Sequence, residues 1–356
     1  MKEFIPRNLP LNLEFSSSLY QKLIVASRTL ATLNGYAKTI PNQEILINAL
    51  LLQEAKDSSE IENIITTHND LYLSKTENKA INKNVKEVEN YEKALKIGYK
   101  LIKEDGLLLN RHILQIQKKL ENNEAGFRKQ GGTTLKNAQT GEIKHIPPQN
   151  PKDIVRLMNN LEQYINNDSL ENIDPLIKMA IIHYQFETIH PFYDGNGRTG
   201  RIINILYLVY KGLLDLPILY LSEYIVQNKA RYYELIQKVR DEDSFEEWIE
   251  YILEGVAKIS NNTIALINAM QEQMQNVVNS LQSNAPKIYS KELVESLFIY
   301  PYTKQDSIKE HLGISRQTAS KYLNTCVDLG ILNEIRIGTK AYYVNTKLCD
   351  LFRKKV

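Results

Sequence analysis

Residues 190 to 201 concentrate more reactive side chains than structural sequence usually carries. The segment holds a histidine, an aspartate, an asparagine, two arginines and three glycines: His190, Asp194, Asn196, Arg198, Arg201, Gly195, Gly197 and Gly200. Imidazole is a base near neutral pH, carboxylate oxygens bind hard cations, and guanidinium groups donate paired hydrogen bonds to phosphate. Glycine lets backbone N–H groups turn toward an anion. The combination indicates a site for a polyphosphate.

The sequence on either side predicts how this segment is held. Residues 202 to 209 are mostly apolar and predict a buried helix that begins where the glycines end. Residues 176 to 186 predict a second buried helix, which Pro191 ends, so that His190 falls in the connecting loop. The helix that contains residues 202 to 209 would turn the free N–H groups of its N-terminus toward the anion. The two arginines, three residues apart, would share one face of its first turns.

The three glycines also fit a different site. Their spacing matches the dinucleotide fingerprint Gly-x-Gly-x-x-Gly, with Asp215 at the distance of its acidic residue. That fingerprint requires a preceding β-strand. The preceding residues have helical length and are rich in Ala, Met, Gln and Glu, so the required context is missing and the sequence argues against this interpretation.

With every defining position matched, residues 190 to 201 resemble the Fic motif, His-x-Phe-x-Asp/Glu-Gly-Asn-Gly-Arg-x-x-Arg. The resemblance implies transfer of AMP from ATP to a Ser, Thr or Tyr hydroxyl of a protein target, the chain itself included. It implies that His190 is the general base and that Asp194 holds Mg²⁺. The nucleotide-binding residues it implies within the motif are Gly195, Asn196, Gly197, Arg198, Thr199, Gly200 and Arg201. Among these, the amide of Asn196 with neighbouring N–H groups would form an anion hole, and the arginines would bind the β- and γ-phosphates.

Three further expectations concern the motif and a neighbouring stretch. Gly197 stands where a kinase-like branch of the family carries lysine, which favours AMP transfer over phosphate transfer. Phe192 is expected to anchor the loop in the core, and Tyr193 to be exposed. Residues 228 to 233 are similar to the family segment near the adenine, which implies Asn228 and Tyr233 as nucleotide contacts, although tyrosines at helical spacing are also typical of a core.

A β-hairpin is expected between residues 131 and 148, because glycine pairs and a Pro-Pro exit are turn and edge signals. In the family a flap at this place lies over the site and pairs with the main chain of the target. His145 lies in this stretch, and we interpret it as a rim or packing residue rather than a metal ligand.

Ser58, Glu62 and Asn63 resemble the inhibitory motif of the family, Ser/Thr-x-x-x-Glu-Gly/Asn, placed N-terminal to the core. They fall in a predicted helical segment, residues 42 to 72, in which Ser58 and Glu62 share one face. The resemblance implies that Glu62 pairs with Arg201, removes the partner of the γ-phosphate and holds the enzyme off. On composition alone, such a run is more typical of a solvated helix face.

Composition agrees with a helical protein of two or more domains. The chain has 356 residues, 43% of them hydrophobic, and a formal net charge of +2, which is too balanced for a protein that coats nucleic acid. Its two cysteines give no disulfide framework, and neither a signal peptide nor an apolar run of membrane-spanning length is present. The expected location is the cytoplasm, away from membranes.

Hydrophobic periodicity predicts a mainly α fold. The resemblance implies a Fic-type helical core with a small β-hairpin flap, plus a C-terminal winged-helix domain. Further helices are expected at residues 83–103, 107–121, 151–167, 229–240 and 244–281. The expected segments are residues 1–105, which carry the inhibitory helix, residues 106–283, the catalytic core whose helices continue upstream to 85, and residues 284–356.

The last of these segments resembles a winged helix-turn-helix. From residue 287 onward, 12 Lys or Arg face 7 Asp or Glu. Residues 303 to 329 predict two helices, the second capped by Ser315, and residues 331 to 344 predict a hairpin. The residues heading the second helix would contact phosphate or base edges: Arg316, Gln317, Ser320 and Lys321. A protein-binding or dimerisation adaptor is an equal alternative.

Two functions therefore stay open. The first is a self-inhibited protein adenylyltransferase that uses ATP and Mg²⁺, with the C-terminal module selecting its location or target. The alternative is a DNA-binding regulator whose Fic core acts as a nucleotide sensor, phosphotransferase or de-AMPylase. A homodimer is compatible with the resemblance, and the sequence does not name the target.

Overall fold

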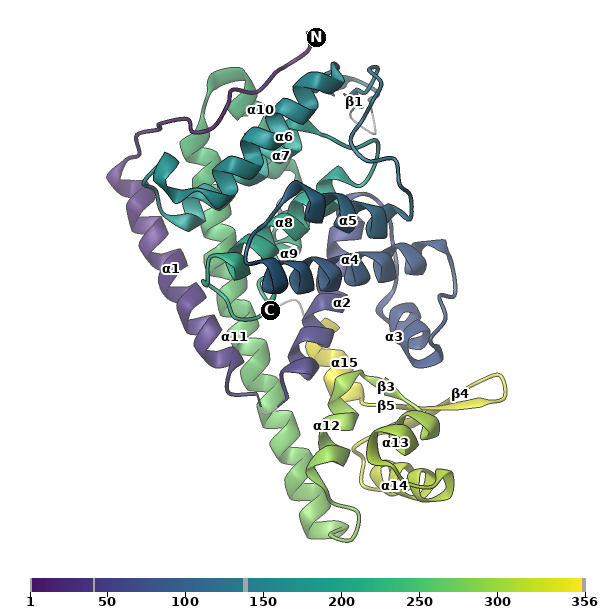
Figure 1. The fold of residues 1–356 in the computed structure, drawn as a ribbon. Coiled ribbons are helices and arrows are strands. Elements are labelled where there is room, and N and C mark those ends of the chain that lie inside the picture. Colours follow the sequence, from purple (N-terminus) through teal and green to yellow (C-terminus); the bar gives the residue numbers. More distant parts are fainter. Residues whose placement is uncertain (1, 41, 137–139, 354–356) are drawn as a thin grey trace. The chain divides into compact units, whose positions relative to one another are not determined.

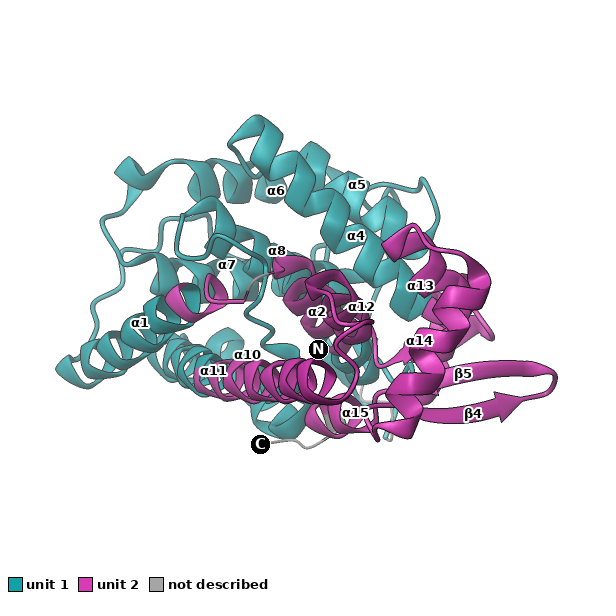
Figure 2. Cartoon of the chain, turned by 90° about the horizontal axis from the view of Figure 1, so that it is seen from below, with its two compact units in different colours: residues 1–34, 54–64, 87–260 teal, residues 35–53, 65–86, 261–356 magenta. Residues whose placement is uncertain are grey.

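The computed structural model describes residues 2–40, 42–136 and 140–353 (Figure 1). The fold is mainly α-helical with two small antiparallel sheets, as the sequence predicts. The chain forms two compact units (Figure 2). Unit 1 comprises residues 1–34, 54–64 and 87–260, and unit 2 comprises residues 35–53, 65–86 and 261–356. The three segments expected from the sequence stay a proposal about its linear organisation.

Unit 1 is built from helices, several of which continue into unit 2. Their bounds are α1 (Ser17–Ala37), α2 (Gln43–Ile61), α4 (Lys83–Asp105), α5 (Asn110–Glu121), α6 (Pro151–Asn166), α7 (Pro175–Ile189), α8 (Asn196–Tyr210), α9 (Ser222–Gln227), α10 (Lys229–Glu242) and α11 (Phe245–Asn284). A short 3₁₀ turn, Asp168–Leu170, precedes α7. Most of these helices were expected, with ends that differ by a few residues, whereas α1 and α9 were not.

Helices α7 and α8 form the centre of unit 1. Asp174 caps the start of α7 by accepting a hydrogen bond from the Leu176 N–H at 2.8 Å, with Pro175 in the first turn. Both helices are buried on nearly all sides, since α7 packs against α6 and α8, and α5 packs against α8. Trp248 of α11 is fully buried, and its indole N–H donates to the Ala180 carbonyl at 2.8 Å. The loop between α7 and α8 is thus held by a rigid core.

The predicted helical segment from 42 to 72 was wrong as a single element. Helix α2 ends at Ile61, and α3 (His68–Glu77) begins after a turn. The Ile64 N–H donates to the Ser59 carbonyl and the Asn63 N–H to the Glu60 carbonyl, both at 3.0 Å. This pair of bonds is a Schellman motif, and Asn63 has the left-handed backbone it requires, with φ of 62°. Glu62 therefore lies in the terminal turn rather than on the helix.

The expected flap is a short hairpin in unit 1. Strand β1 (Leu135–Lys136) pairs antiparallel with β2 (Ile143–His145), so that Leu135 faces His145. The expected hairpin, residues 131 to 148, also includes residues 137–139, which lie outside the described residues. The paired strands give the flap only a small amount of regular structure.

Unit 2 contains α3 and the C-terminal elements. These are α12 (Lys291–Ile299), β3 (Tyr302–Thr303), α13 (Gln305–Leu312), α14 (Arg316–Asp328), β4 (Asn333–Ile337), β5 (Lys340–Val344) and α15 (Thr346–Arg353). The strand order is β3-β5-β4, and β4 and β5 form the expected hairpin, in which Ile337 pairs with Lys340. Ser315 caps α14 as expected, since its hydroxyl accepts from the Thr318 N–H at 3.1 Å.

The apolar core of unit 2 includes the start of α2. Ile45 is fully buried in one cluster with Met270, Leu293 and Leu323. Asn42, just before α2, donates to the Glu295 carboxylate at 3.2 Å. In the described ranges, no helix combines the length and the apolar character needed to cross a lipid bilayer.

Candidate active site

His190 occupies the C-cap of α7 in a left-handed conformation, with φ of 49°. Its N–H donates to the Phe186 carbonyl at 3.0 Å, and its carbonyl accepts from Arg128 Nε at 2.8 Å. Arg128 also donates to the Pro148 carbonyl at 2.8 Å, which joins the flap exit to the His190 loop. Sequence reasoning missed this role of Arg128, because a buried arginine that binds carbonyl oxygens has no sequence motif.

The imidazole of His190 lies in a desolvated, cationic setting. Its Nδ1 is buried and makes no hydrogen bond within the described part of the chain. Burial, with His145 and Arg128 nearby, lowers the pKa of His190 to about 3. The ring is therefore neutral near pH 7, which is the form in which an imidazole can accept a proton.

His145 is a packed residue, as interpreted from the sequence. It is 2% exposed, and its Nε2 lies 2.9 Å from the Thr188 carbonyl oxygen. Burial lowers the pKa of His145 to about 4. The side chain thus ties β2 to the end of α7.

The loop after His190 is anchored from inside. Phe192 is fully buried, with its ring 5.3 Å from that of Phe127 and 6.3 Å from that of Phe186, which confirms the expected core anchor. The Asn196 side chain accepts from the Phe192 N–H and donates to the Phe192 carbonyl, each at 2.8 Å. In this structure the Asn196 amide holds the loop through the Phe192 backbone, and its expected part in an anion hole stays a prediction.

Two side chains of the loop reach the surface. Tyr193 is 50% exposed, as expected, and its hydroxyl accepts from the Lys129 N–H at 2.9 Å. Asp194 is exposed, and its Oδ1 accepts from the Gly195 N–H at 2.7 Å. An exposed carboxylate at the start of a helix is available to a cation.

The first turn of α8 carries the glycines against which two carboxylates lie. Gly195 is the N-cap, with φ of 76°, a conformation that glycine adopts without strain. A Cβ atom at Gly197 would overlap the Glu62 carboxylate, and one at Gly195 would overlap the Glu121 carboxylate. Carboxylates thus occupy the helix end that attracts anions.

Arg201 is held by the terminal turn of α2. Its Nε donates to the Ser58 hydroxyl at 2.7 Å, and its Nη2 donates to the Ser58 carbonyl and to Glu62 Oε1, each at 2.9 Å. Arg201 is 3% exposed, whereas Glu62 is 36% exposed, so the pair opens to solvent on the glutamate side. The expected contact of Glu62 with Arg201 is present, and Ser58 adds to it.

Arg198 has different partners, so the two guanidinium groups do not converge on one carboxylate. Its Nη2 donates to Glu121 at 2.8 Å, and its Nη1 lies 3.3 Å from Glu87. Neither glutamate was identified from the sequence, because α5 and α4 bring them to α8 only in the folded chain. Thr199 and Gly200, the other predicted contacts, are buried in the first turns of α8.

Glu187 is a further buried carboxyl group beside the motif. Its side chain lies against Gly200, and its Oε1 makes no hydrogen bond among the residues described. Burial raises the pKa of Glu187 to about 7, against the opposing effect of Arg201.

The predicted adenine contacts lie near the terminal turn of α2. Asn228 precedes α10, and its amide donates to the Tyr224 carbonyl at 2.9 Å. Tyr233 is 47% exposed, and burial of its hydroxyl raises the pKa of Tyr233. Between them, Lys229 Nζ donates to the Ile61 carbonyl at 2.7 Å and caps the end of α2.

The predicted DNA-binding residues belong to α14 of unit 2. Arg316, Gln317 and Lys321 are exposed, and Arg316 lies 3.7 Å from Asp306. Ser320 is half-buried, and its hydroxyl accepts from Gln305 Nε2 at 3.0 Å. Three of the four side chains are therefore accessible to a partner.

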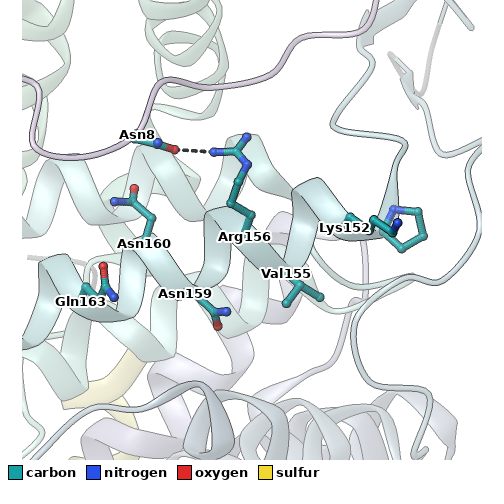
Figure 3. A pocket seen from close by; sticks show the side chains of 8 residues that line it. Asn8, Lys152, Val155, Arg156, Asn159, Asn160 and Gln163 are labelled. Atoms are coloured by element: carbon teal, nitrogen blue, oxygen red, sulfur yellow. Dashed lines mark hydrogen bonds between the residues drawn. The ribbon is translucent and has the colours of Figure 1, made fainter.

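A hollow on α6 contains none of the predicted site residues (Figure 3). Its floor is the outer face of the helix, and Arg156 donates to Asn8 Oδ1 across it at 2.6 Å. The lining residues are Asn8, Pro151, Lys152, Val155, Arg156, Asn159, Asn160 and Gln163. With no buried reactive group, it is a surface feature of α6.

Three family models match successive parts of the chain. Residues 20–100 match the Fic/DOC family N-terminal model, and residues 107–208 match the Fic/DOC family model. Residues 273–348 match the model described as protein adenylyltransferase SoFic-like, C-terminal domain. The central match contains the whole segment from His190 to Arg201.

Curated relatives match over a shorter stretch. The chain is 31% identical over 141 residues to protein adenylyltransferase fic-1 of Caenorhabditis elegans, which covers 39% of this chain and 25% of that protein. It is 28% identical over 156 residues to protein adenylyltransferase Fic of Drosophila mojavensis, with 41% and 30% covered. The match thus spans 25 to 30% of the length of these two relatives.

Solved structures share the fold. A Fic family protein from Desulfovibrio desulfuricans G20 superposes with a TM-score of 0.61 at 19% identity, covering 94% of this chain and 98% of that one. Fic-1 from Caenorhabditis elegans superposes with a TM-score of 0.55 at 19% identity, covering 72% and 75%. These likenesses extend the agreement from the motif to the surrounding helices.

Proposed function

The chain belongs to the Fic/DOC family, and on this premise we propose that it is a protein adenylyltransferase that moves AMP from ATP to a hydroxyl group of a protein. The observation that carries the proposal is the place of His190, whose ring is neutral, in the short loop before the N-terminus of α8, a helix end that attracts anions. Adenylyltransferase names among the relatives support the same reaction.

In the proposed reaction the phosphates bind along the first turn of α8. Backbone N–H groups of that turn and the helix dipole favour the negative charge. Arg198 and Arg201 donate to the β- and γ-phosphates once their present carboxylate partners yield. Asn196 holds the loop through Phe192, and its amide is proposed to join the backbone N–H groups of Gly195 and Gly197 in the anion hole.

His190 accepts the proton of the target hydroxyl as its oxygen attacks the α-phosphorus. The bond between the α-phosphorus and the oxygen that bridges to the β-phosphate breaks, and pyrophosphate leaves. A pKa of about 3 makes the imidazole a weak base in the free protein. The negative charge of bound phosphates raises the pKa of an adjacent imidazole, which strengthens the base when the nucleotide is in place.

Asp194 is the residue suited to hold Mg²⁺. It is exposed at the mouth of the loop and offers carboxylate oxygens, the donors that this ion prefers. The ion would supply charge neutralisation to the phosphates. Asn228 and Tyr233 flank the end of α2 and are proposed to line the adenine end of the site.

Glu62 keeps this site closed in the proposed resting state. It occupies Arg201 and covers Gly197, so a γ-phosphate would lose one donor and meet a negative charge. The exposed side of the pair leaves Glu62 free to be displaced. The chain as it stands is therefore expected to transfer AMP slowly.

The test compares ATP labelled at the α-phosphate with ATP labelled at the γ-phosphate. We expect Glu62→Gly to raise α-label incorporation into protein by an order of magnitude or more over the parent chain, about the effect of restoring one charged partner. His190→Ala in that background removes the incorporation. Label from the γ-phosphate alone would contradict AMP transfer and indicate phosphate transfer.

The C-terminal elements follow the order of a winged helix, and we propose that they form a module that selects the target or the location. Exposed Arg316, Gln317 and Lys321 at the start of α14 support a docking role. A regulator that binds DNA through α14 is the second candidate. Gel-shift titration with DNA separates the two candidates, comparing the parent with an Arg316→Ala, Lys321→Ala variant. Only the second candidate predicts that the parent binds DNA and that the variant binds it more weakly. A cytoplasmic location fits either role.

A further inference from the structure

Arg198 is more completely neutralised than Arg201. It faces two carboxylates, Glu121 at 2.8 Å and Glu87 at 3.3 Å, whereas the ion pair of Arg201 is with Glu62 at 2.9 Å. Arg198 is 4% exposed and Glu121 is 13% exposed, so water screens this pair little. A phosphate that approaches Arg198 therefore meets the Glu121 carboxylate already bound to the same guanidinium group.

Glu121 also lies where an anion would bind. Its carboxylate is in contact with Gly195, the N-cap of α8, just as the Glu62 carboxylate is in contact with Gly197. Each of the two carboxylates therefore covers one glycine of the same helix end and occupies one arginine of the motif. The two arrangements are parallel, although Glu121 ends α5 and Glu62 follows α2.

We propose that Glu121 is a second internal competitor for the nucleotide, which withholds Arg198 from the phosphates as Glu62 withholds Arg201. This rests on the proposed function, since it concerns the same ATP site. Its consequence is that release of Glu62 alone leaves the site partly closed. Glu121 acts through Arg198 and is a positioning residue rather than a catalytic one.

The geometry favours competition over mere orientation of Arg198. Glu87 already binds Nη1, so the guanidinium has a partner that orients it without Glu121. The Nε atom of Arg198 is buried and makes no hydrogen bond to any residue that the structure describes, so one donor awaits an acceptor. Burial raises the pKa of Glu121; Arg198 lowers it, and the nearby carboxylates of Asp194 and Glu87 raise it. The negative charge of Glu121 is therefore destabilised in the folded protein.

The experiment measures ATP binding in the presence of Mg²⁺ by calorimetry. The background is Glu62→Gly with His190→Ala, which frees Arg201 and prevents turnover. Adding Glu121→Gln should lower the Kd for ATP about tenfold, because an isosteric amide no longer holds Arg198 or repels phosphate. Glu124→Gln is the matched control: Glu124 is 78% exposed, pairs with Lys118, and undergoes the same change in charge. The control should leave the Kd unchanged.

A kinetic readout separates competition from a general effect on the fold. With His190 intact, Glu121→Gln in the Glu62→Gly background should lower the KM for ATP and leave kcat nearly unchanged. Glu121→Asp, whose shorter side chain withdraws the carboxylate, should lower the Kd in the same direction. It decides the question if the glutamine variant does not fold.

The outcomes are distinct. If the background protein itself does not bind ATP, the proposed function fails. If the background binds ATP and Glu121→Gln matches Glu124→Gln, Glu121 is no competitor and only this inference fails. A weaker affinity for ATP in Glu121→Gln would also contradict the inference, and it would show that Glu121 orients Arg198 for the nucleotide.

Discussion

At the scale of single residues, the site is a set of charges whose partners come from far along the chain. The sequence predicted the Glu62–Arg201 contact from a motif, and that contact is present at 2.9 Å. It did not predict Glu121 and Glu87 on Arg198, because no local spacing links these glutamates to α8. It also did not predict that the Asn196 amide bonds to the Phe192 backbone four residues earlier. Local sequence identifies reactive groups but not the long-range partners that occupy them.

The ionisation of His190 gives a prediction at this scale. Because burial lowers its pKa to about 3, the free protein should keep the ring neutral above that value, and a positive charge should form only below it. An NMR titration of the ring protons, assigned with His190→Ala, should therefore show no inflection for His190 from about pH 8 to about pH 5. An inflection near the ordinary histidine pKa would mean that the ring is solvated, and the proposed setting of the base would be wrong.

At the scale of elements, the site depends on how helices end. Periodicity located most helices, but it carried the expected helix from residue 42 through the turn after Ile61. The signal for that turn was Asn63, since asparagine accepts the left-handed backbone that closes a Schellman motif. Helix α1 was missed although it has regularly spaced buried residues, and α9 is too short to show a period. Ends of helices depend on single residues that periodicity averages out.

The turn that presents Glu62 can be tested through Asn63. Its φ of 62° costs a Cβ-bearing residue such as alanine about 1 kcal/mol, while glycine adopts it freely. We expect Asn63→Ala to loosen the turn and raise AMP transfer above the parent, and Asn63→Gly to stay near the parent. Incorporation of α-labelled ATP measures both. Equal rates for the two variants would show that the left-handed turn does not control Glu62.

At the scale of the whole molecule, successive parts of the sequence alternate between the two units. Residues 54–64, which carry the inhibitory motif, belong to unit 1, while residues 35–53 and 65–86 on either side belong to unit 2 (Figure 2). On the unit 2 side, Ile45 of α2 is buried in the core, and Glu77 of α3 is hydrogen-bonded to Tyr342 at 2.9 Å. Division of the sequence into consecutive segments could not predict that neighbouring residues belong to different units, because periodicity does not show which segments pack together.

The continuity of α2 predicts that burial of Ile45 near its start helps to fix Glu62, which follows its last residue. Ile45→Ala removes a fully buried side chain from the start of α2 and should destabilise unit 2 by roughly 2 to 4 kcal/mol. Because α2 continues to the turn that carries Glu62, we expect AMP transfer to rise, though less than in Glu62→Gly. The measurements are thermal unfolding and incorporation of α-labelled ATP.

Leu323→Ala is the control for that experiment. Leu323 is fully buried in the same apolar cluster but lies on α14, which does not continue to Glu62. It should lower thermal stability without raising AMP transfer. An equal rise in both variants would mean that loss of stability, rather than the anchoring of α2, releases the site.

In the proposed function, His190 is the base for AMP transfer at the N-terminus of α8, and Glu62 holds this site closed. Intact-protein mass spectrometry after incubation with ATP and Mg²⁺ tests it most directly, on the parent, on Glu62→Gly and on Glu62→Gly with His190→Ala. We expect Glu62→Gly, or a target protein incubated with it, to gain the mass of one AMP, the parent to gain little, and the double variant to gain none. A gain equal to one phosphate, or an AMP gain that persists without His190, would contradict it.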